Sequence, residues 1–207
     1  LLWGGVLKGQ ELIENAKIKS IVNDMKAVQA AYNGYLDRYK ALPGDETAAV
    51  MTARGFAGAA GAATANNGVL NVTVAQTFTN GGDQAAFWRA LRASGLIAGD
   101  PTIAANNIAA MPKHAGGGLL GVTGDPLGVY GQPGVSVCAA GLSPKQAAGV
   151  DALIDGAAPI APNFANNVGS VRGATAAANP LAPTNAAPAG ANIDESAATT
   201  WTVCMHM

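Results

Sequence analysis

Charged and aromatic side chains are both scarce in this chain of 207 residues. Charged residues make up 12% of it and aromatic residues 5%, whereas soluble domains usually carry about 25% charged residues. The 12 basic residues are balanced by 13 acidic ones, so the formal net charge is −1. Binding to phosphates needs a cluster of cations, and this balance therefore argues against a nucleic-acid partner.

Histidine and cysteine are scarcer still, with two of each. Such low numbers argue against a zinc site with several protein ligands. The glycine run after His114 lacks the Gly-Lys-Ser/Thr ending of a phosphate-binding loop, so we expect a flexible loop there. The acidic residues of the second half are too scattered for a calcium-binding loop. No nucleophile–base or carboxylate pair is visible either, so we predict no enzyme, no catalytic residue, no metal and no cofactor.

A long helix is the clearest predicted element. Residues 9–39 contain no proline, and apolar side chains recur every three or four positions, as on one face of a helix. Pro43 ends the pattern because proline cannot continue a helix. A helix of about 30 to 40 residues is roughly 45–60 Å long, which is more than a small domain can cover. A coiled-coil or core helix is the alternative interpretation.

The chain begins with an uncharged apolar segment, Leu1 to Leu7. Seven residues span only about 10 Å, whereas a membrane-spanning helix needs about 20 residues. The segment lacks the basic start and the Ala-x-Ala cleavage site of a signal peptide. We therefore interpret it as the end of an apolar membrane helix whose beginning precedes this sequence.

The rest of the chain predicts short strands and helices between alanine- and glycine-rich loops. We expect a strand at 69–78, a helix after Asp83 that ends at Gly95, and a meander of strands at 119–122, 127–130 and 135–138. Ser143 to Gln146 is typical of a helix start, and Gly156 of its end. We predict a surface loop at 174–198 and a closing strand at 199–205. The expected class is α+β.

Two stretches at the start of the chain resemble proteobacterial type IV pilin-like proteins, which carry a prepilin N-terminal methylation motif. They are Gly5-Val6-Leu7-Lys8-Gly9-Gln10-Glu11-Leu12-Ile13-Glu14-Asn15-Ala16 and Tyr35-Leu36-Asp37-Arg38-Tyr39-Lys40-Ala41-Leu42-Pro43-Gly44-Asp45. Weaker matches follow in the same order, at 87–97, 154–156, 169–173 and 201–204. The resemblance implies a helix of residues 1–42 and a globular head of residues 43–207, with the helix packed on a small antiparallel sheet.

The resemblance also implies a function and assigns residues to it. The chain would be a structural subunit of an extracellular filament on the bacterial surface, a helical homopolymer made by inner-membrane assembly machinery from a membrane-inserted precursor. The helix would pack in the filament core through Leu1, Leu2, Trp3, Val6, Leu7, Leu12, Ile13, Ile18 and Ile21. It would pack on the head through Met25, Val28, Tyr32, Tyr35, Leu36 and Tyr39.

The two cysteines, Cys138 and Cys204, are expected to form a disulfide. Paired cysteines are usual in exported proteins, and the bridge that closes the C-terminal region of pilins implies the same pairing here. Two buried reduced thiols are the alternative.

Two other functions stay open at this point. The first is a pseudopilin of a type II secretion system, which shares the same helix. The second, from a different class, is a monomeric surface module for ligand binding or cell adhesion. The low aromatic content argues against a ligand pocket of that kind.

Overall fold

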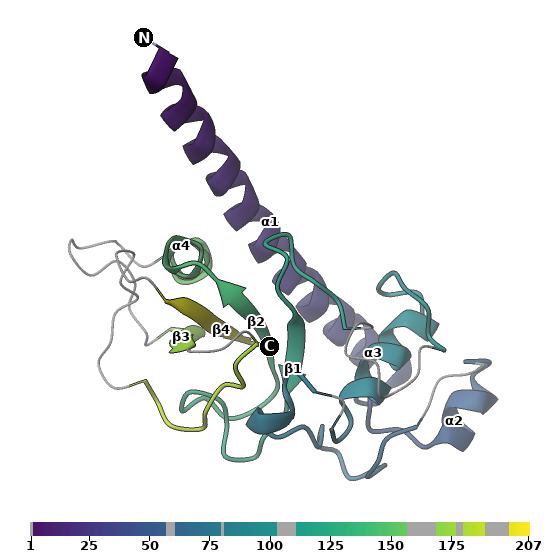
Figure 1. Cartoon of the computed structure of the whole chain (residues 1–207). Coiled ribbons are helices and arrows are strands. Elements are labelled where there is room, and N and C mark those ends of the chain that lie inside the picture. The colour runs from purple at the N-terminus through teal and green to yellow at the C-terminus, as the bar shows by residue number, and fades with distance from the viewer. Residues whose placement is uncertain are drawn as a thin grey trace.

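A long N-terminal helix and a four-stranded antiparallel sheet form the fold (Figure 1). The structure is a computed structural model that describes residues 2–56, 61–79, 81–102, 111–156, 169–176, 180–188 and 199–207. Helix α1 spans Leu2–Tyr39, and its N-terminal half stands clear of the head. The predicted α+β class is confirmed. Helix α1 ends at Tyr39, three residues before the expected end at Leu42, because the next residue, Lys40, has a left-handed backbone (φ 53°).

The sheet has the strand order β1-β2-β4-β3. Its strands are β1 (Leu120–Thr123), β2 (Ser136–Leu142), β3 (Val171–Ala176) and β4 (Thr200–His206). The two central strands, β2 and β4, lie far apart in the sequence, and Cys138 pairs directly with Cys204 across them. The last strand of the chain is therefore inserted between two earlier ones.

Alternate residues of the strands belong to two separate apolar clusters, as the two-residue period of a strand requires. Val137, Ala139, Val203 and Met205 join the main core with helix α1, helix α3 (Gln84–Ala93) and helix α4 (Pro144–Asp155). The intervening residues Cys138, Ala140 and Cys204 join a second, smaller cluster with Phe78, Met111, Val129 and Tyr130. The disulfide thus lies on the sheet face opposite the main core.

The predicted helices are confirmed, and the residues at their ends show how each helix begins or ends. Ser143 and Gln146 form a reciprocal capping box at the start of α4, and Gly156 ends that helix with a left-handed backbone (φ 69°). Asp83 precedes α3 but does not cap it. Its carboxylate instead accepts hydrogen bonds from the backbone N–H groups of Ala63 and Asn71, at 2.7 and 3.0 Å. A short helix, α2 (Ala48–Ala53), follows α1.

The strand predicted at 69–78 is wrong, since this segment is irregular apart from the 3₁₀ turn η1 (Val74–Gln76). Polar side chains at the end of β1 and just after it take the backbone hydrogen bonds that a sheet would need. Thr123 donates its hydroxyl to the Val72 carbonyl (2.9 Å), and Asp125 accepts the Val74 N–H (3.0 Å). The β-branched residues instead serve burial, because Val72 is 1% exposed.

Two further boundaries differ from expectation. Residues 127–130 form no strand, because Gly128 and Tyr130 have positive φ angles and the chain turns there. Strand β3 takes the first three residues of the loop predicted at 174–198. Residues 180–188 are irregular, and the remainder of that segment lies outside the described residues.

Gly149 allows helices α1 and α4 to approach each other closely. A Cβ atom at this position would lie 2.8 Å from Cδ1 and 2.9 Å from Cγ2 of Ile18, whereas a Cβ at Gly9 would meet nothing within 4 Å. We expect Gly149→Ala to lower the free energy of unfolding by about 1–3 kcal/mol through overpacking. Gly9→Ala is the matched control, in which helix propensity alone adds up to about 1 kcal/mol. Urea denaturation measures both, and equal effects would contradict the close approach.

Candidate functional site

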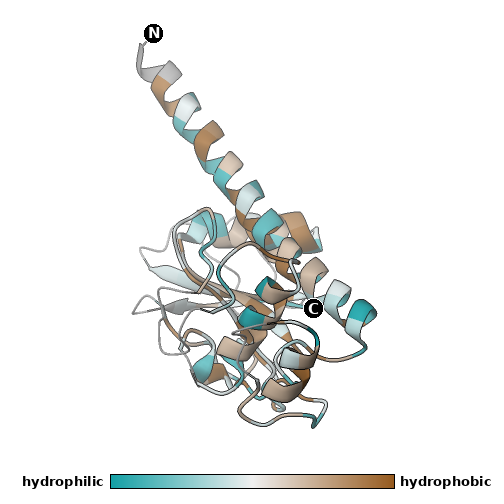
Figure 2. Cartoon of the chain, turned by 90° about the vertical axis from the view of Figure 1, so that its right-hand side faces the viewer, coloured by the Kyte–Doolittle hydropathy of each residue, from teal (hydrophilic) through white to brown (hydrophobic). Residues whose placement is uncertain are grey.

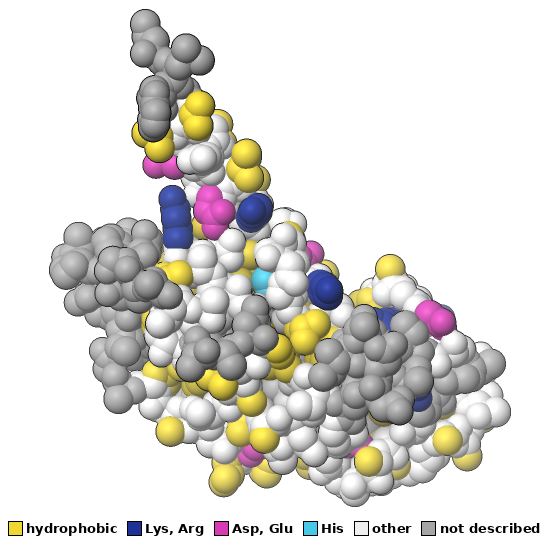
Figure 3. All heavy atoms as spheres, in the orientation of Figure 1, with side chains coloured by type: hydrophobic (Ala, Val, Ile, Leu, Met, Phe, Trp, Pro, Cys, Tyr) yellow, Lys and Arg dark blue, Asp and Glu magenta, His cyan; other side chains and the backbone are white. Residues whose placement is uncertain are grey.

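The N-terminal half of α1 exposes large apolar side chains to solvent. From Val6 to Lys17 no described side chain of the helix is buried. Val6, Leu7, Leu12 and Ile13 are each about 60% exposed, at 59%, 60%, 66% and 60%. Figure 2 shows apolar residues recurring along this half, and Figure 3 shows apolar side chains on its surface with charged side chains beside and below them. Isolated exposed apolar residues are common, but a row of them on one helix indicates an interaction surface.

The helix face that is in line with Ile18 is mainly polar in the protruding half of α1. Counting back from Ile18, the first buried residue among the described side chains of α1, steps of 4, 7 and 11 residues reach Glu14, Glu11 and Leu7. Such steps keep to one helix face. A groove of about 420 Å³ runs along this face and is lined by Leu7, Gln10, Glu11, Glu14 and Lys145.

The opposite side of the protruding half carries an apolar surface, which we call the outer stripe: Val6, Gly9, Leu12, Ile13 and Ala16. At 100° per residue these positions lie about 120–180° around the helix from Ile18. The outer stripe therefore points away from Ile18, where burial of α1 in the head begins. The head buries no described side chain of α1 before Ile18, so this apolar surface stays exposed in the single chain.

Two residues assigned to the filament core belong to the head instead. Ile18 is 5% exposed and Ile21 is fully buried, and both lie in the main core. Ile18 packs on α4 at Gly149, so that assignment is wrong for these two residues. The two residues were misassigned because the burial of α1 in the head begins at Ile18 and not farther along the helix. Leu1 and the side chains of Leu2 and Trp3 lie outside the described residues.

The C-terminal half of α1 anchors the helix in the head. Met25, Val28, Tyr32 and Tyr35 are buried in the main core, and Leu36 and Tyr39 pack against it in part. Aromatic contacts fix this half in place. Tyr32 lies 6.4 Å from Phe87 of α3 between ring centroids, and Tyr39 meets Phe56 edge-on at 5.5 Å.

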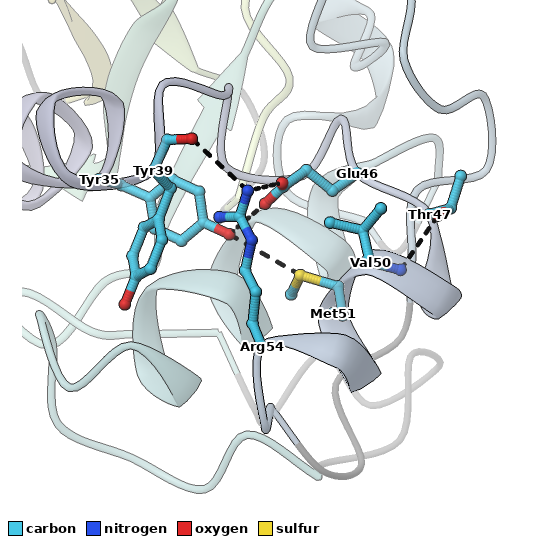
Figure 4. A network of polar contacts seen from close by, with 7 residues as sticks. All are labelled: Tyr35, Tyr39, Glu46, Thr47, Val50, Met51 and Arg54. Carbon is cyan, nitrogen blue, oxygen red and sulfur yellow. Dashed lines mark hydrogen bonds and ion pairs between the residues drawn. The ribbon is translucent and has the colours of Figure 1, made fainter.

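A buried polar network ties the segment after α1 back onto the helix (Figure 4). The Tyr35 hydroxyl donates to Oε2 of Glu46 at 2.5 Å, and Arg54 forms an ion pair with Oε1 of Glu46 at the same distance. The Arg54 guanidinium also lies over the Tyr39 ring, 4.6 Å from its centroid. Burial, and next the hydrogen bond to Glu46, raise the pKa of Tyr35 well above its ordinary value. The hydroxyl therefore stays protonated and keeps its role as donor.

Removing that hydroxyl should destabilise the head measurably. A hydrogen bond to a charged group is worth about 1.5–3 kcal/mol, so we expect Tyr35→Phe to lower the free energy of unfolding by about that amount. Tyr39→Phe is the matched control, because among the described residues the Tyr39 hydroxyl has no hydrogen-bond partner; its effect should stay within about 0.5 kcal/mol. Thermal or urea unfolding distinguishes the two. Equal losses would show that the network adds nothing.

The predicted disulfide is confirmed. Cys138 and Cys204 are bridged, both sulfurs are fully buried, and the bridge joins residues 66 positions apart. It therefore links the two central strands of the sheet.

The described part of the chain contains no group of three or more potential metal-ligating side chains. Within the same part, no helix is both long and apolar enough to cross a membrane.

Comparison of the chain with family models, with curated proteins and with solved structures found no match. The candidate site is therefore described from this structure alone: a helix anchored in the head, whose protruding half exposes an apolar stripe.

Proposed function

We propose that this chain is the structural subunit of an extracellular type IV pilus-like filament, in which the protruding halves of α1 bundle together. The observation that carries the proposal is the outer stripe. Its apolar side chains are exposed and lie on the half of α1 that stands clear of the head, so neighbouring copies can contact them without displacing any part of the head.

Burial of the outer stripe supplies the driving force. Burying one Leu, Ile or Val side chain contributes about 1.5–3 kcal/mol, and the stripe carries three such residues. Gly9 and Ala16 leave room for a neighbouring helix to approach closely. A contact between different faces of successive copies produces an open helical polymer rather than a closed ring when the rotation does not close.

The remaining parts of the proposal rest on the resemblance of residues 5–16 and 35–45 to type IV pilin-like proteins. A precursor would be held in the inner membrane by an apolar helix that continues into α1. The assembly machinery of that membrane would then transfer subunits into the filament. The disulfide supports an oxidising, extracytoplasmic location, because such bonds form and persist there.

Negative-stain electron microscopy and sedimentation velocity on the full-length chain test this function. We expect thin filaments in the micrographs and a rapidly sedimenting species beside the monomer. A chain that stays strictly monomeric at every concentration would contradict the proposal and favour a monomeric surface module.

A further inference from the structure

The turn at 112–120 is tightly packed, unlike the flexible loop expected from its glycines. Leu120 donates its N–H to the Pro112 carbonyl (2.8 Å), and His114 donates its N–H to the Gly118 carbonyl (3.0 Å). The glycines are required for space, since a Cβ at Gly116 would lie 2.8 Å from Cε1 of His114 and a Cβ at Gly118 would overlap the Ala140 carbonyl. We call residues 112–120 the His114 turn.

Both ring nitrogens of His114 are used, and the side chain is 3% exposed. Nε2 lies 2.9 Å from the Ala140 carbonyl of β2, and Nδ1 accepts the Gly116 N–H at 3.0 Å. A carbonyl can only accept and a backbone N–H can only donate. Nε2 therefore carries the proton, Nδ1 carries the lone pair, and the geometry fits the neutral imidazole alone.

The His114 turn contacts α1 where the helix leaves the head. Ala115 donates its N–H to Oδ2 of Asp24 at 2.8 Å, and Gly116 packs beside the Ile21 side chain. Ile18, one turn earlier, is the first buried residue among the described side chains of α1. The contact therefore covers the first attached turns of the helix.

We infer that His114 makes this contact sensitive to pH: the neutral imidazole holds the His114 turn on α1, and protonation at Nδ1 releases the turn while the sheet stays folded. A proton on Nδ1 would point at the Gly116 N–H, so a hydrogen bond would be replaced by two opposed donors. The positive charge of the imidazolium would also be buried, and the Ala140 carbonyl, which already accepts the Nε2 proton, could not accept the new one. Release of the turn relieves both costs.

The electrostatic surroundings support this direction. Burial lowers the pKa of His114, against smaller upward contributions from the Ala140 carbonyl and from Asp24 on α1. From strand β2, the group that contacts the ring is the Ala140 carbonyl, which carries no net charge. Lys113, the charged residue of the turn itself, is exposed to solvent. A histidine whose folded pKa lies below its unfolded value of about 6.5 stabilises the closed state above that pH. This contribution is lost as the pH falls through the folded pKa. The inference concerns the single chain and holds whether or not it assembles.

Amide hydrogen exchange of the full-length chain between pH 7.5 and 4.5 tests the inference. After correction for intrinsic rates, we expect the opening of Ala115 and Gly116 to increase about tenfold per pH unit below 6.5, until the folded pKa is reached. The amide of Val203 in β4 should stay protected. His114→Gln should abolish the pH dependence, because its amide offers a donor and an acceptor but gains no proton. His206→Gln, the change at the other histidine, should leave the profile as in the native chain.

Three results would overturn the inference: an unchanged profile in His114→Gln, opening of Val203 in parallel with the turn, or a pH-independent native profile. If His114→Gln does not fold by circular dichroism, the imidazole resonances of the native chain decide instead. Titration of His114 at or above pH 6.5 would then refute the inference, and titration below it together with the opening of the turn would support it.

Discussion

Replacing Ile13 with aspartate is expected to abolish filament formation while the head stays folded. Ile13 lies in the middle of the outer stripe and is 60% exposed in the single chain, so the change costs the monomer little. In a bundle the same position would be buried. The variant would lose the burial of one isoleucine, about 1.5–3 kcal/mol, and would have to bury a carboxylate as well. A total loss of at least about 3 kcal/mol per contact raises the concentration needed for assembly more than about a hundredfold.

Leu127→Asp is the matched control for this experiment. Leu127 is also a large exposed apolar residue, 76% accessible, but it belongs to the head and not to α1. The same chemical change there should leave filaments intact. Micrographs of both variants, with circular dichroism to verify the fold, give the answer. Filaments that persist in Ile13→Asp, or that disappear equally in Leu127→Asp, would refute the role of the outer stripe.

Removing the disulfide is expected to have the largest effect on stability. The bridge joins residues 66 positions apart, and closing a loop of that size stabilises the folded state by about 4 kcal/mol in the chain-entropy model. It also links β2 to β4, the two central strands of the sheet. The double variant Cys138→Ala/Cys204→Ala should therefore unfold roughly 8–16 °C below the native chain.

Differential scanning calorimetry of the native and double-variant chains measures this shift. The native chain refolded and kept under a reducing agent is the control, since it lacks the bridge but retains both sulfur atoms. It should also melt well below the oxidised chain. A double variant that melts within about 2 °C of the oxidised chain would show that strand pairing alone holds β4 in place.

The elements predictable from the sequence were those with local signals. The three- and four-residue spacing of apolar residues gave α1, the Ser143–Gln146 capping box gave the start of α4, and alternation gave β4. Each of these patterns is set by neighbours in the sequence. The disulfide was expected for a similarly simple reason, because the chain has only two cysteines.

The errors came from contacts between distant segments. The β-branched residues of 69–78 have strand propensity, but Thr123 and Asp125 bind their backbone and prevent pairing. The glycines after His114 suggest flexibility, yet they are needed to enclose a buried ring. Ile18 and Ile21 belong to the same apolar pattern as Ile13, and only the placement of α4 and the His114 turn shows where the head begins to cover the helix.

The outer stripe itself could have been found from the sequence. A helical count from Met25 places Gly9, Leu12 and Ala16 about 140–180° around the helix, away from the head-anchoring residues, and Val6 and Ile13 at the edge of that side. Treating the apolar residues of α1 as one broad stripe concealed the part of this surface that the head leaves uncovered.

Helical reconstruction of the filaments by electron cryomicroscopy tests the central claim most directly. The proposed function predicts that residues 6–16 of α1 lie at the filament axis, that Val6 and Ile13 contact α1 of neighbouring copies, and that the sheet and the disulfide lie outside. A reconstruction with the heads at the axis and the outer stripe of α1 exposed to solvent would contradict it.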